Sequence, residues 1–442
     1  MQELQDRLRA AGVHTLLAQF TDIHGVARGK YLPLHQMDAL LTEGAGFSGP
    51  SIWGTGLART GSRSEYWGRG DPSTAQPLPW MPGYARLACD GFVDGQPFEA
   101  CPRQVLRRAE ARLAERGWQL RSGIEPEFFL LKHGPQGDFL PFDDLDRLDK
   151  PSYDLKSLPR QAALLHELRA SLEACGMTVL QIDHEDAHGQ YELNFVYDRA
   201  LISADRLMLF KLAAHAIAEK HGALFSMMPK PFADQPGSGM HFHVSLWSDA
   251  AGDSARCLFA GSDGKELMRR FIAGVLAHAP ALCALAAPTV NSYKRLTVGE
   301  SISGTTWAPA YIAHGPNNRT ALVRTLPGRF EWRLPDASAN PYLASAALIA
   351  AGLDGIDRNL QAPPACDDDL FALSLPEIHA RGITLLPQSL SEALDALESD
   401  AVIRAALGET LTAQFLNLKR EEWLGYARHV SHWEMQRYAG TF

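Results

Sequence analysis

Four short segments of the chain share one pattern, in which charged or polar residues alternate with apolar residues at every second position. The segments are residues 124–130, 190–195, 240–247 and 329–334. Because neighbouring side chains of a β-strand point to opposite faces of the sheet, each segment predicts a strand with one apolar and one polar face. For a single strand, a polar face exposed to water is the simpler interpretation. None of the four polar faces contains lysine, however, and together they predict a shared polar interior.

These polar faces carry the residue types of a metal site. The residues that would meet there are Glu125, Glu127, Glu192, His241 and Glu331. Such a cluster of like charges needs divalent cations to offset the repulsion. Carboxylate oxygens with one imidazole suit hard ions, Mg²⁺ or Mn²⁺, better than zinc. Glu185, in the acidic run 183–186, is a further candidate ligand.

Arginines supply the opposite charge. They are Arg295, Arg319, Arg324, Arg329 and Arg333. Surface salt bridges are one interpretation of such residues, but arginine is also the side chain that binds phosphate and carboxylate through paired hydrogen bonds. Metal ligands together with several arginines are typical of phosphoryl transfer, where catalysis consists mainly of positioning and charge neutralisation.

Composition and motifs exclude several classes of protein. A formal net charge of −9 argues against a nucleic acid or an anionic membrane as the main partner. Residues 25–31 resemble a phosphate-binding P-loop, but the spacing is one residue short and Tyr31 stands where a hydroxyl should bind magnesium. The sequence contains no glycine-rich dinucleotide motif, no nucleophile elbow and no His-Glu-x-x-His. A dehydrogenase or serine hydrolase therefore has no motif in its favour.

The expected compartment is the cytoplasm. Six cysteines without a Cys-x-x-Cys pair indicate reduced core thiols, and the first residues lack the basic and apolar regions of a secretory signal. The most apolar stretches, 271–288 and 342–353, are interrupted or too short for a bilayer, and they predict buried helices.

The chain of 442 residues is long enough for two or three domains. Residues 1–100 predict a small α+β unit with a helix over 4–11, a strand over 14–20 and a long loop over 44–82. A helix over 104–117 follows Pro102 and opens a second unit, residues 101–442. Further helices are expected over 157–175, 203–221, 264–278, 389–407 and 409–438.

Several of these segments resemble the glutamine synthetase family, in the order of that family. They are GIEPEF at 123–128, GSGMHFH at 237–243, NSYKRL at 291–296, NR at 318–319 and RFEWRLPDASANPY at 329–342. The resemblance spans nearly the whole chain. It implies an α+β fold with an N-terminal β-grasp domain, residues 1–100, and a catalytic domain, residues 101–442, built on a curved antiparallel sheet. It also implies a ring-shaped homo-oligomer, a dodecamer, with active sites between neighbouring subunits.

The resemblance also implies roles for individual residues. One metal ion would be bound by Glu127, Glu185 and Glu192, and a second by Glu125, His241 and Glu331. Glutamate would contact Gly237, Arg295 and Arg333, beside Glu127 and His241. The phosphates of ATP and the transferring phosphoryl group would be held by Arg319, Arg324 and Arg329, and the nucleotide by His243 and Ser245. The implied reaction forms γ-glutamyl phosphate from glutamate and ATP, and an amine then displaces phosphate.

The chain departs from the family where ammonium binds. Members that use ammonia carry an aspartate in a loop supplied by the neighbouring subunit, and here that loop contains Ser48. Trp307 stands where a second acid is usual, although Glu300 could supply a carboxylate instead. The loss of anions weakens the capture of a small hydrated cation, whereas Trp307 and Trp53 would suit an N-alkyl group through burial and cation–π contact.

Four further segments resemble γ-glutamylmethylamide synthetases, a branch of the family. They are residues 20–25, 51–56, 183–186 and 306–311. We therefore expect methylamine as the amine substrate. The alternatives are a glutamine synthetase that uses ammonia, a γ-glutamyl ligase for another amine such as a polyamine, and a non-catalytic homologue. Candidates for the base that deprotonates the amine are Glu185, Asp186 and Tyr153.

Overall fold

The computed structural model describes residues 2–249, 254–299 and 307–442. A first sheet is formed by β1 (Thr15–Thr21), β2 (Ala27–Pro33), β3 (Ala45–Ser48), β4 (Glu65–Gly70), β5 (Gln76–Pro77), β6 (Tyr84–Val93) and β7 (Gln96–Pro97). Its main strand order is β2-β1-β6-β4-β3, with a parallel pair β1–β6 and antiparallel pairs elsewhere. Helices α1 (Gln2–Ala10) and α2 (Met37–Thr42) accompany it. The predicted helix over 4–11 and strand over 14–20 are confirmed.

The prediction of a continuous loop over 44–82 is wrong, because β3, β4 and β5 lie within it. The sequence of β4, Glu-Tyr-Trp-Gly-Arg-Gly, has weak strand propensity, and its two partners β3 and β6 determine its conformation. A Cβ atom on Gly68 would lie 3.3 Å from the ring of Phe47 and 3.4 Å from Cys89. Glycine therefore permits the close packing that this part of the sheet requires.

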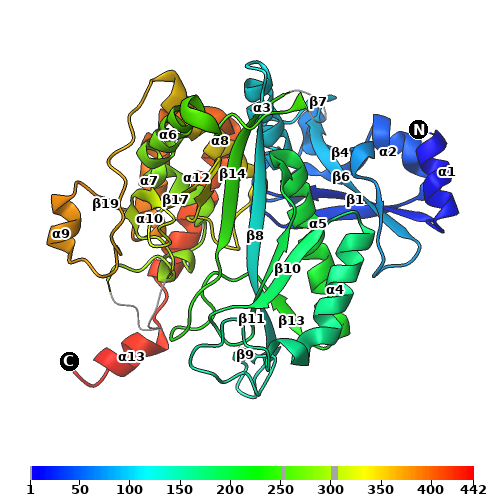
Figure 1. Cartoon of the computed structure of the whole chain (residues 1–442). Helices are drawn as coiled ribbons and strands as arrows, with labels where there is room; N and C mark the ends of the chain where they lie inside the picture. The colour runs from blue at the N-terminus through cyan, green and yellow to red at the C-terminus, as the bar shows by residue number, and fades with distance from the viewer. Residues whose placement is uncertain (1, 250–253, 300–306) are drawn as a thin grey trace.

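The second sheet contains all four strands that the alternating pattern predicts. Its order is β10-β11-β8-β14-β18-β17-β16. The bounds are β8 (Trp118–His133), β10 (Val179–His184), β11 (Gln190–Phe195), β14 (Met240–Ser248), β16 (His314–Pro316), β17 (Val323–Leu326) and β18 (Arg329–Trp332). Short strands β9 (Phe139–Pro141), β12 (Asp198–Arg199) and β13 (Leu224–Ser226) also pair with β8. The pairs are antiparallel except β16–β17, and β8 and β14 run side by side through the centre of the molecule in Figure 1.

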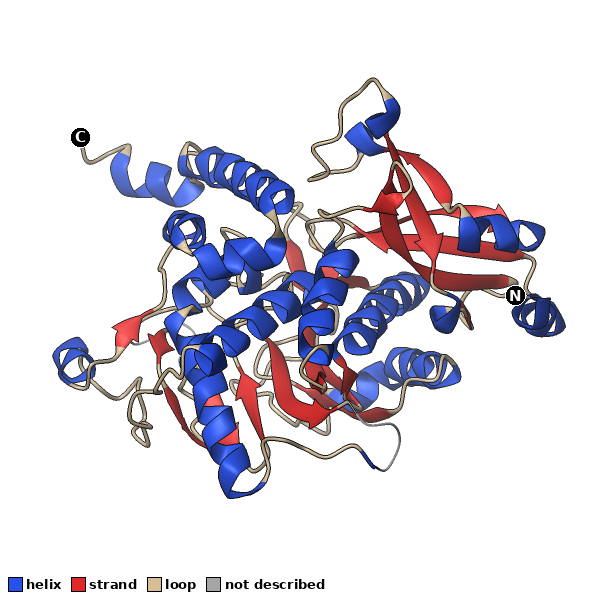
Figure 2. Cartoon of the chain, turned by 90° about the horizontal axis from the view of Figure 1, so that it is seen from above, coloured by secondary structure: helices blue, strands red, loops and turns tan. Residues whose placement is uncertain are grey.

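The helices after residue 100 lie around this central pair, except two that lie at the edge of the molecule in Figure 1, Leu375–Ala380 and His432–Tyr438. The helices are α3 (Pro102–Ala114), α4 (Ala162–Ala174), α5 (Ala200–Lys220), α6 (Gly261–Ala277), α7 (Ala279–Ala286), α8 (Pro341–Asp357), α9 (Leu375–Ala380), α10 (Leu390–Ser399), α11 (Ala401–Leu407), α12 (Glu409–Ala427) and α13 (His432–Tyr438). In Figure 1, α6, α7 and α10 lie to the left of β14, and α4, α5 and the N-terminal sheet lie to the right of β8. Figure 2 shows the N-terminal sheet at one end of the molecule. The strands β15 (Tyr311–Ile312) and β19 (Thr384–Leu385) form a separate pair.

Two of the expected helices are each divided in two. The segment 389–407 breaks at Asp400, whose carboxylate accepts the backbone N–H groups of Val402 and Ile403 at 3.0 Å and thereby begins α11. The segment 409–438 breaks before α13, where Ser431 and Glu434 form a capping box. Local side-chain capping therefore interrupts a continuous helical pattern.

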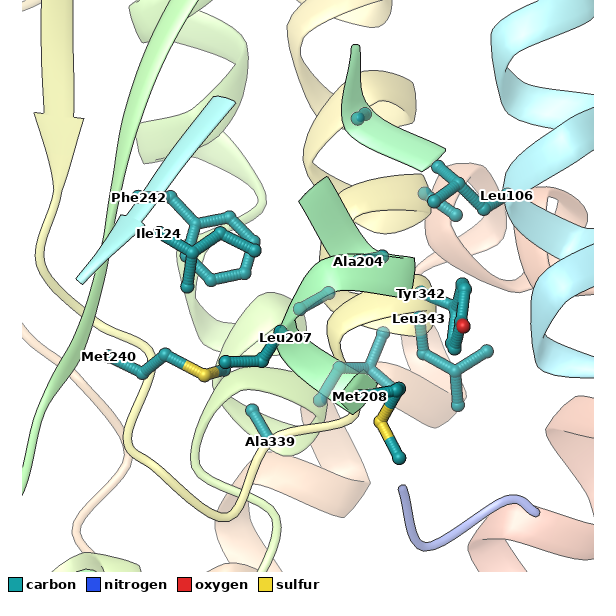
Figure 3. Packing of buried hydrophobic residues seen from close by; sticks show 14 of the residues in the cluster. Leu106, Ile124, Ala204, Leu207, Met208, Met240, Phe242, Ala339, Tyr342 and Leu343 are labelled. Atoms are coloured by element: carbon teal, nitrogen blue, oxygen red, sulfur yellow. The ribbon is translucent and has the colours of Figure 1, made fainter. Parts of the chain in front are cut away.

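The apolar faces of the four strands form one side of the hydrophobic core. Ile124, Phe242, Phe330 and Trp332 are each 0% or 1% exposed. Figure 3 shows Ile124 and Phe242 facing residues of α5, among them Leu207, with Tyr342 and Leu343 of α8 beyond. Because the side chains alternate, burial of this face turns the acids of the same strands to the opposite face.

The most apolar helices are buried, as expected. Most residues of α7 and α8 are buried, and α6 packs against α8. No single described helix is long and apolar enough to cross a membrane, although α6 and α7, bent by 74° at their junction, meet the length and composition test as a pair.

The crossing of α6 and α8 generates a first prediction. A methyl group on Gly274 would overlap the carbonyl oxygen of Ala351, and it would lie 2.8 Å from the backbone nitrogen of Gly355. Gly274→Ala should therefore force the helices apart and lower stability by about 1–3 kcal/mol, as overpacking does. Thermal unfolding followed by circular dichroism measures the effect.

The matched control is Gly425→Ala in α12, where an added methyl group meets no atom within 4 Å. This change should leave the midpoint unchanged or raise it, since alanine favours a helix over glycine by about 0.5–1 kcal/mol. Equal midpoints for Gly274→Ala and the wild type would contradict the close crossing.

Candidate active site

The strand register brings the predicted acids together on the polar face of the second sheet. Glu127 of β8 lies opposite Glu192 of β11, and Glu125 of β8 lies opposite His241 of β14. Glu331 of β18 completes the row, with His241 Nδ1 3.4 Å from its Oε1. All of these except Glu125 are buried.

Among the residues that the structure describes, three groups of side chains place their ligand atoms within 4.8 Å of one another. They are Glu125, His241 and Glu331; Glu127, Glu192 and His241; and Asp183, Glu185 and Glu192. The first group contains all three residues that the sequence resemblance assigns to the second metal ion. The other predicted set is divided, because Glu192 belongs to the group of Glu127 and also to that of Glu185.

Asp183 is absent from the predicted ligands, yet it lies opposite Glu192 across the β10–β11 pair. Its place in the acidic run 183–186 was visible in the sequence, but the strand that orients it was not. These groups fit one or more divalent cations.

Burial governs the charge of the carboxylates around Glu127. It raises the pKa of Glu127 to about 7, against partial opposition from Arg295. Burial, followed by the neighbouring carboxylates, raises the pKa of Glu185 and Glu192 well above the usual range. Burial also lowers the pKa of His241 well below its usual value, and Arg333 lowers it further. A neutral imidazole beside several closely spaced carboxylates is a ligand set that suits divalent cations, because a cation would favour the ionised form of each carboxylate.

The other end of the row is compensated by arginine. Arg324 donates to Glu331 Oε2 at 2.9 Å, and Arg333 donates to Oε1 of the same carboxylate. Burial acts to raise the pKa of Glu331, but Arg333, His243 and Arg324 outweigh it and the pKa is lowered. Glu331 therefore stays ionised.

A first cavity lies beside the acid cluster. Its lining includes Glu185, Asp186, Lys230, Gly237, Arg295 and Trp307. The indole N–H of Trp307 donates to Asp186 Oδ2 at 2.8 Å, and Arg333 Nη2 donates to the Trp307 carbonyl at 3.1 Å. These two bonds fix the indole beside the acids. Arg295 is buried and donates to the backbone carbonyls of Leu334 and Arg333 at 3.1 and 3.3 Å.

A second cavity opens on the other side of the row. Its lining includes Glu125, Tyr197, His243, Ser245, Trp247 and Arg329. His243 Nε2 lies 3.1 Å from Glu125 Oε1, and Arg329 Nε donates to His243 Nδ1 at 3.3 Å. The combination of aromatic rings and arginine suits a flat heteroaromatic ring with an anionic group attached.

The sequence prediction missed two aromatic residues of this second cavity. The rings of Tyr197 and Trp247 are stacked, with centroids 6.4 Å apart. Trp247 continues the alternation of His243 and Ser245 and could have been found from that signal. Tyr197 follows the end of β11 and carries no such pattern.

Several predicted residues do not line either cavity. Ser48 ends β3 on the N-terminal sheet, where its hydroxyl accepts a hydrogen bond from Ser51. Trp53 is 58% exposed on the same unit, and Arg319 is exposed between β16 and β17. Glu300 lies outside the described residues.

Tyr153 lies beside the acidic run, although it is 72% exposed. Its backbone N–H donates to the His184 carbonyl at 2.9 Å, and its φ is 62°. Burial and then Glu185 raise the pKa of its phenol. A phenol with a raised pKa is a poorer base than either neighbouring carboxylate.

Comparison with known proteins agrees with this geometry. Residues 99–438 match the family model of the glutamine synthetase catalytic domain. A glutamate–methylamine ligase of Methyloversatilis universalis is 47% identical, with 100% of this chain and 99% of that protein aligned. A glutamine synthetase of Halobacterium salinarum is 41% identical over 99% of this chain and 96% of that protein. A solved structure described as a GmaS/ADP complex superposes with a TM-score of 0.91 at 38% identity, covering 99% of this chain and 100% of that one.

The raised pKa values give a prediction of pH dependence. Glu127 titrates near 4.5 when unfolded and near 7 when folded, so the folded protein holds more protons than the unfolded chain between these values. The stability contributed by Glu127 therefore falls as pH rises through this window, and Glu185 and Glu192, whose pKa values are also raised, act in the same direction. Mg²⁺ should raise the unfolding midpoint more at about pH 8 than at about pH 5.5, because it binds the ionised carboxylates.

Glu192→Gln should remove most of the difference between the two pH values in the rise of the unfolding midpoint that Mg²⁺ causes. Glu173→Gln is the matched control, since Glu173 is a surface residue of α4 paired with Arg169. A Mg²⁺-induced gain in wild-type midpoint that is equal at both pH values would contradict the assigned cluster.

Proposed function

The chain belongs to the glutamine synthetase family, and on that premise we propose that it is an ATP-dependent ligase that joins methylamine to the γ-carboxylate of glutamate. The carrying observation is Trp307, which Asp186 and Arg333 fix beside a buried cluster of carboxylates. The 47% identical relative named a glutamate–methylamine ligase supports the choice of amine. ATP is the co-substrate, and ADP and phosphate are released through γ-glutamyl phosphate.

We propose that two or more Mg²⁺ or Mn²⁺ ions occupy the acid row. Glu125, His241 and Glu331 would hold one ion, and Glu127, Glu185 and Glu192 another, with Asp183 beside them. Bound there, the ions would neutralise the charge of the phosphates. The neutral imidazole of His241 and the raised pKa values of Glu127, Glu185 and Glu192 support this assignment.

The remaining polar residues divide between the two cavities. We propose that His243, Ser245, Arg324 and Arg329 bind ATP, joined by Tyr197 and Trp247 for the base, and that Arg319 reaches the phosphates. Gly237, Arg295 and Arg333 would bind glutamate. In this arrangement the γ-carboxylate of glutamate meets the γ-phosphate across the acid row, between the two cavities.

The amine is proposed to enter beside Trp307. A protonated methylamine would be attracted by Asp186 and Glu185, and its methyl group would pack on the indole. One of these carboxylates would take the proton that the amine must lose before attack. Asp186 is held in place by Ser152 and by Trp307, which donate to its two oxygens.

We further propose the quaternary and domain organisation that the family implies. Residues 1–100 would form a β-grasp domain, supported by the parallel pair β1–β6, and residues 101–442 the catalytic domain. A cytoplasmic dodecamer would bring Ser48 and Trp53 of one subunit to the amine site of the next. Neither residue lines a cavity of its own chain, which supports this arrangement.

The direct test is phosphate release from ATP with Mg²⁺, glutamate and a series of amines. Methylamine should exceed ammonia in kcat/KM by about tenfold or more, as one methyl group in a fitted pocket allows. Ethylamine and putrescine extend the series, and Glu127→Ala serves as an inactive control. A preference for ammonia would leave the ligase chemistry standing but refute the alkylamine site.

The contribution of Trp307 can be isolated by mutation. Trp307→Ala should lower the ratio of methylamine to ammonia kcat/KM about fivefold to tenfold, because a buried methyl contact and a cation–π contact are lost. Trp307→Phe keeps an aromatic face and should retain more of the ratio. Ser48→Asp should shift the ratio in the direction of ammonia by restoring an anion.

The ratio of methylamine to ammonia kcat/KM is measured within each variant, so a general loss of activity does not change it. An unchanged ratio in Trp307→Ala would show that the indole does not select the amine.

A further inference from the structure

Lys230 is a buried lysine whose ammonium group faces backbone rather than acid. It lies between β13 and β14, lines the first cavity and is 9% exposed. Its Nζ donates to the carbonyls of Phe232 at 2.9 Å and Ala233 at 3.2 Å, and also to that of Gln235. An ammonium group has three donors, so these three carbonyls use its full capacity.

A buried ammonium group is costly unless its hydrogen bonds are made. Lysine is therefore an unusual choice for a merely structural loop, where a neutral donor would suffice. Within the described chain, Lys230 has no carboxylate within ion-pair distance. Its charge is offset by the carbonyl dipoles of residues 232–235 and, from beyond ion-pair distance, by the Asp234 carboxylate of the same loop. The ammonium group therefore draws several peptide groups of one loop to a single point.

The two ends of this loop are also tied together. The Asn291 side chain accepts from the Lys230 N–H at 2.8 Å and donates to the Lys230 carbonyl at 3.0 Å. The Ser238 N–H donates to the Pro229 carbonyl at 2.7 Å. Residues 229–238 therefore form a closed loop with the ammonium group at its centre.

This loop forms a wall of the cavity and contacts the acid cluster. The Gly239 N–H donates to Glu127 Oε2 at 2.7 Å, and Gln190 Nε2 donates to the Gly237 carbonyl at 3.2 Å. A side chain on Gly237 would overlap the Pro229 carbonyl. A change in the loop conformation would therefore also move the peptide groups that the loop presents to the cavity.

We propose that Lys230 is a positioning residue, which holds residues 232–239 in the conformation that binds the amino-acid substrate, glutamate. The role rests on the proposed function, because glutamate is taken as the ligand of the Gly237 wall. Lys230 acts through the loop and does not contact the substrate, since its donors are already engaged by carbonyl groups.

The test compares Lys230→Met, which keeps the length of the side chain without the charge, with Lys230→Arg, which keeps donors. Hydrogen bonds to a charged group are lost in the first, so KM for glutamate should rise about tenfold to a hundredfold. KM for ATP and for methylamine should stay within about twofold, and Lys230→Arg should recover part of the glutamate KM. Lys220→Met, which removes a surface lysine paired with Glu167, is the matched control.

A second readout is independent of turnover. Hydrogen–deuterium exchange of Lys230→Met should lose protection at residues 232–239, with β8 and β14 unchanged. Glutamate added with Mg²⁺ and ADP should raise the unfolding midpoint less in Lys230→Met than in the wild type.

The outcomes separate the two proposals. If wild type fails to use methylamine but Lys230→Met still loses loop protection and glutamate binding, the proposed amine is wrong and the role of Lys230 stands. An unchanged glutamate KM with unchanged exchange at 232–239 overturns the role of Lys230. Equal increases in KM for all three substrates overturn it as well, because they indicate a general structural defect.

Discussion

The repulsion among carboxylates on one face of four strands is the constraint on which the rest of the structure depends. Glu127 and Glu192 are directly opposed across β8 and β11, and after burial these two carboxylates are the main causes that raise the pKa of Glu185. Like charges in this arrangement oppose folding unless they are protonated or bound to cations. The strands hold them because their other faces are fully buried against helices such as α5 and α8. The apolar core thus holds in place a cluster that is unfavourable without a ligand.

Charge is distributed unevenly along this row of acids, and the unevenness separates two tasks. Glu331, at the β18 end, is paired with Arg324 and Arg333 and stays ionised. Under the proposed function, Arg324 would meet the phosphates at this end and Arg333 would meet glutamate. Around Glu185 and Glu192 at the β11 end, carboxylates outnumber cations, which suits a metal ion or a protonated amine. Trp307 lies between the two ends, since its indole is bound to Asp186 and its carbonyl to Arg333. Under the proposed function, the γ-phosphate of ATP and the protonated amine would therefore approach the γ-carboxylate of the substrate glutamate from opposite sides.

Sequence alternation was sufficient to predict this face because each strand turns apolar side chains to the helices and polar side chains to the opposite face. The four predicted strands occupy neighbouring positions in the sheet, and the set Glu125, His241 and Glu331 meets as expected. The same reasoning failed where pairing or capping dominates over local pattern. β4 contains two glycines and takes its conformation from β3 and β6, while Asp400 ends one helix and begins another. Asp183 and Tyr197 were missed because their orientation depends on β10 and on the end of β11, which carry no clear period.

The positions of Ser48 and Trp53 show how far a single chain accounts for the chemistry. Ser48 ends β3 of the N-terminal sheet and Trp53 lies in a turn after it, whereas the cavity beside Trp307 is built from the second sheet and its loops. In the proposed dodecamer, a second copy of the chain would place the N-terminal unit of one subunit over the cavity of the next. Amine choice would then be divided between two subunits, with Trp307 and Asp186 from one and Ser48 from its neighbour. Under that arrangement the same contacts that assemble the ring also determine which amine reaches the acids.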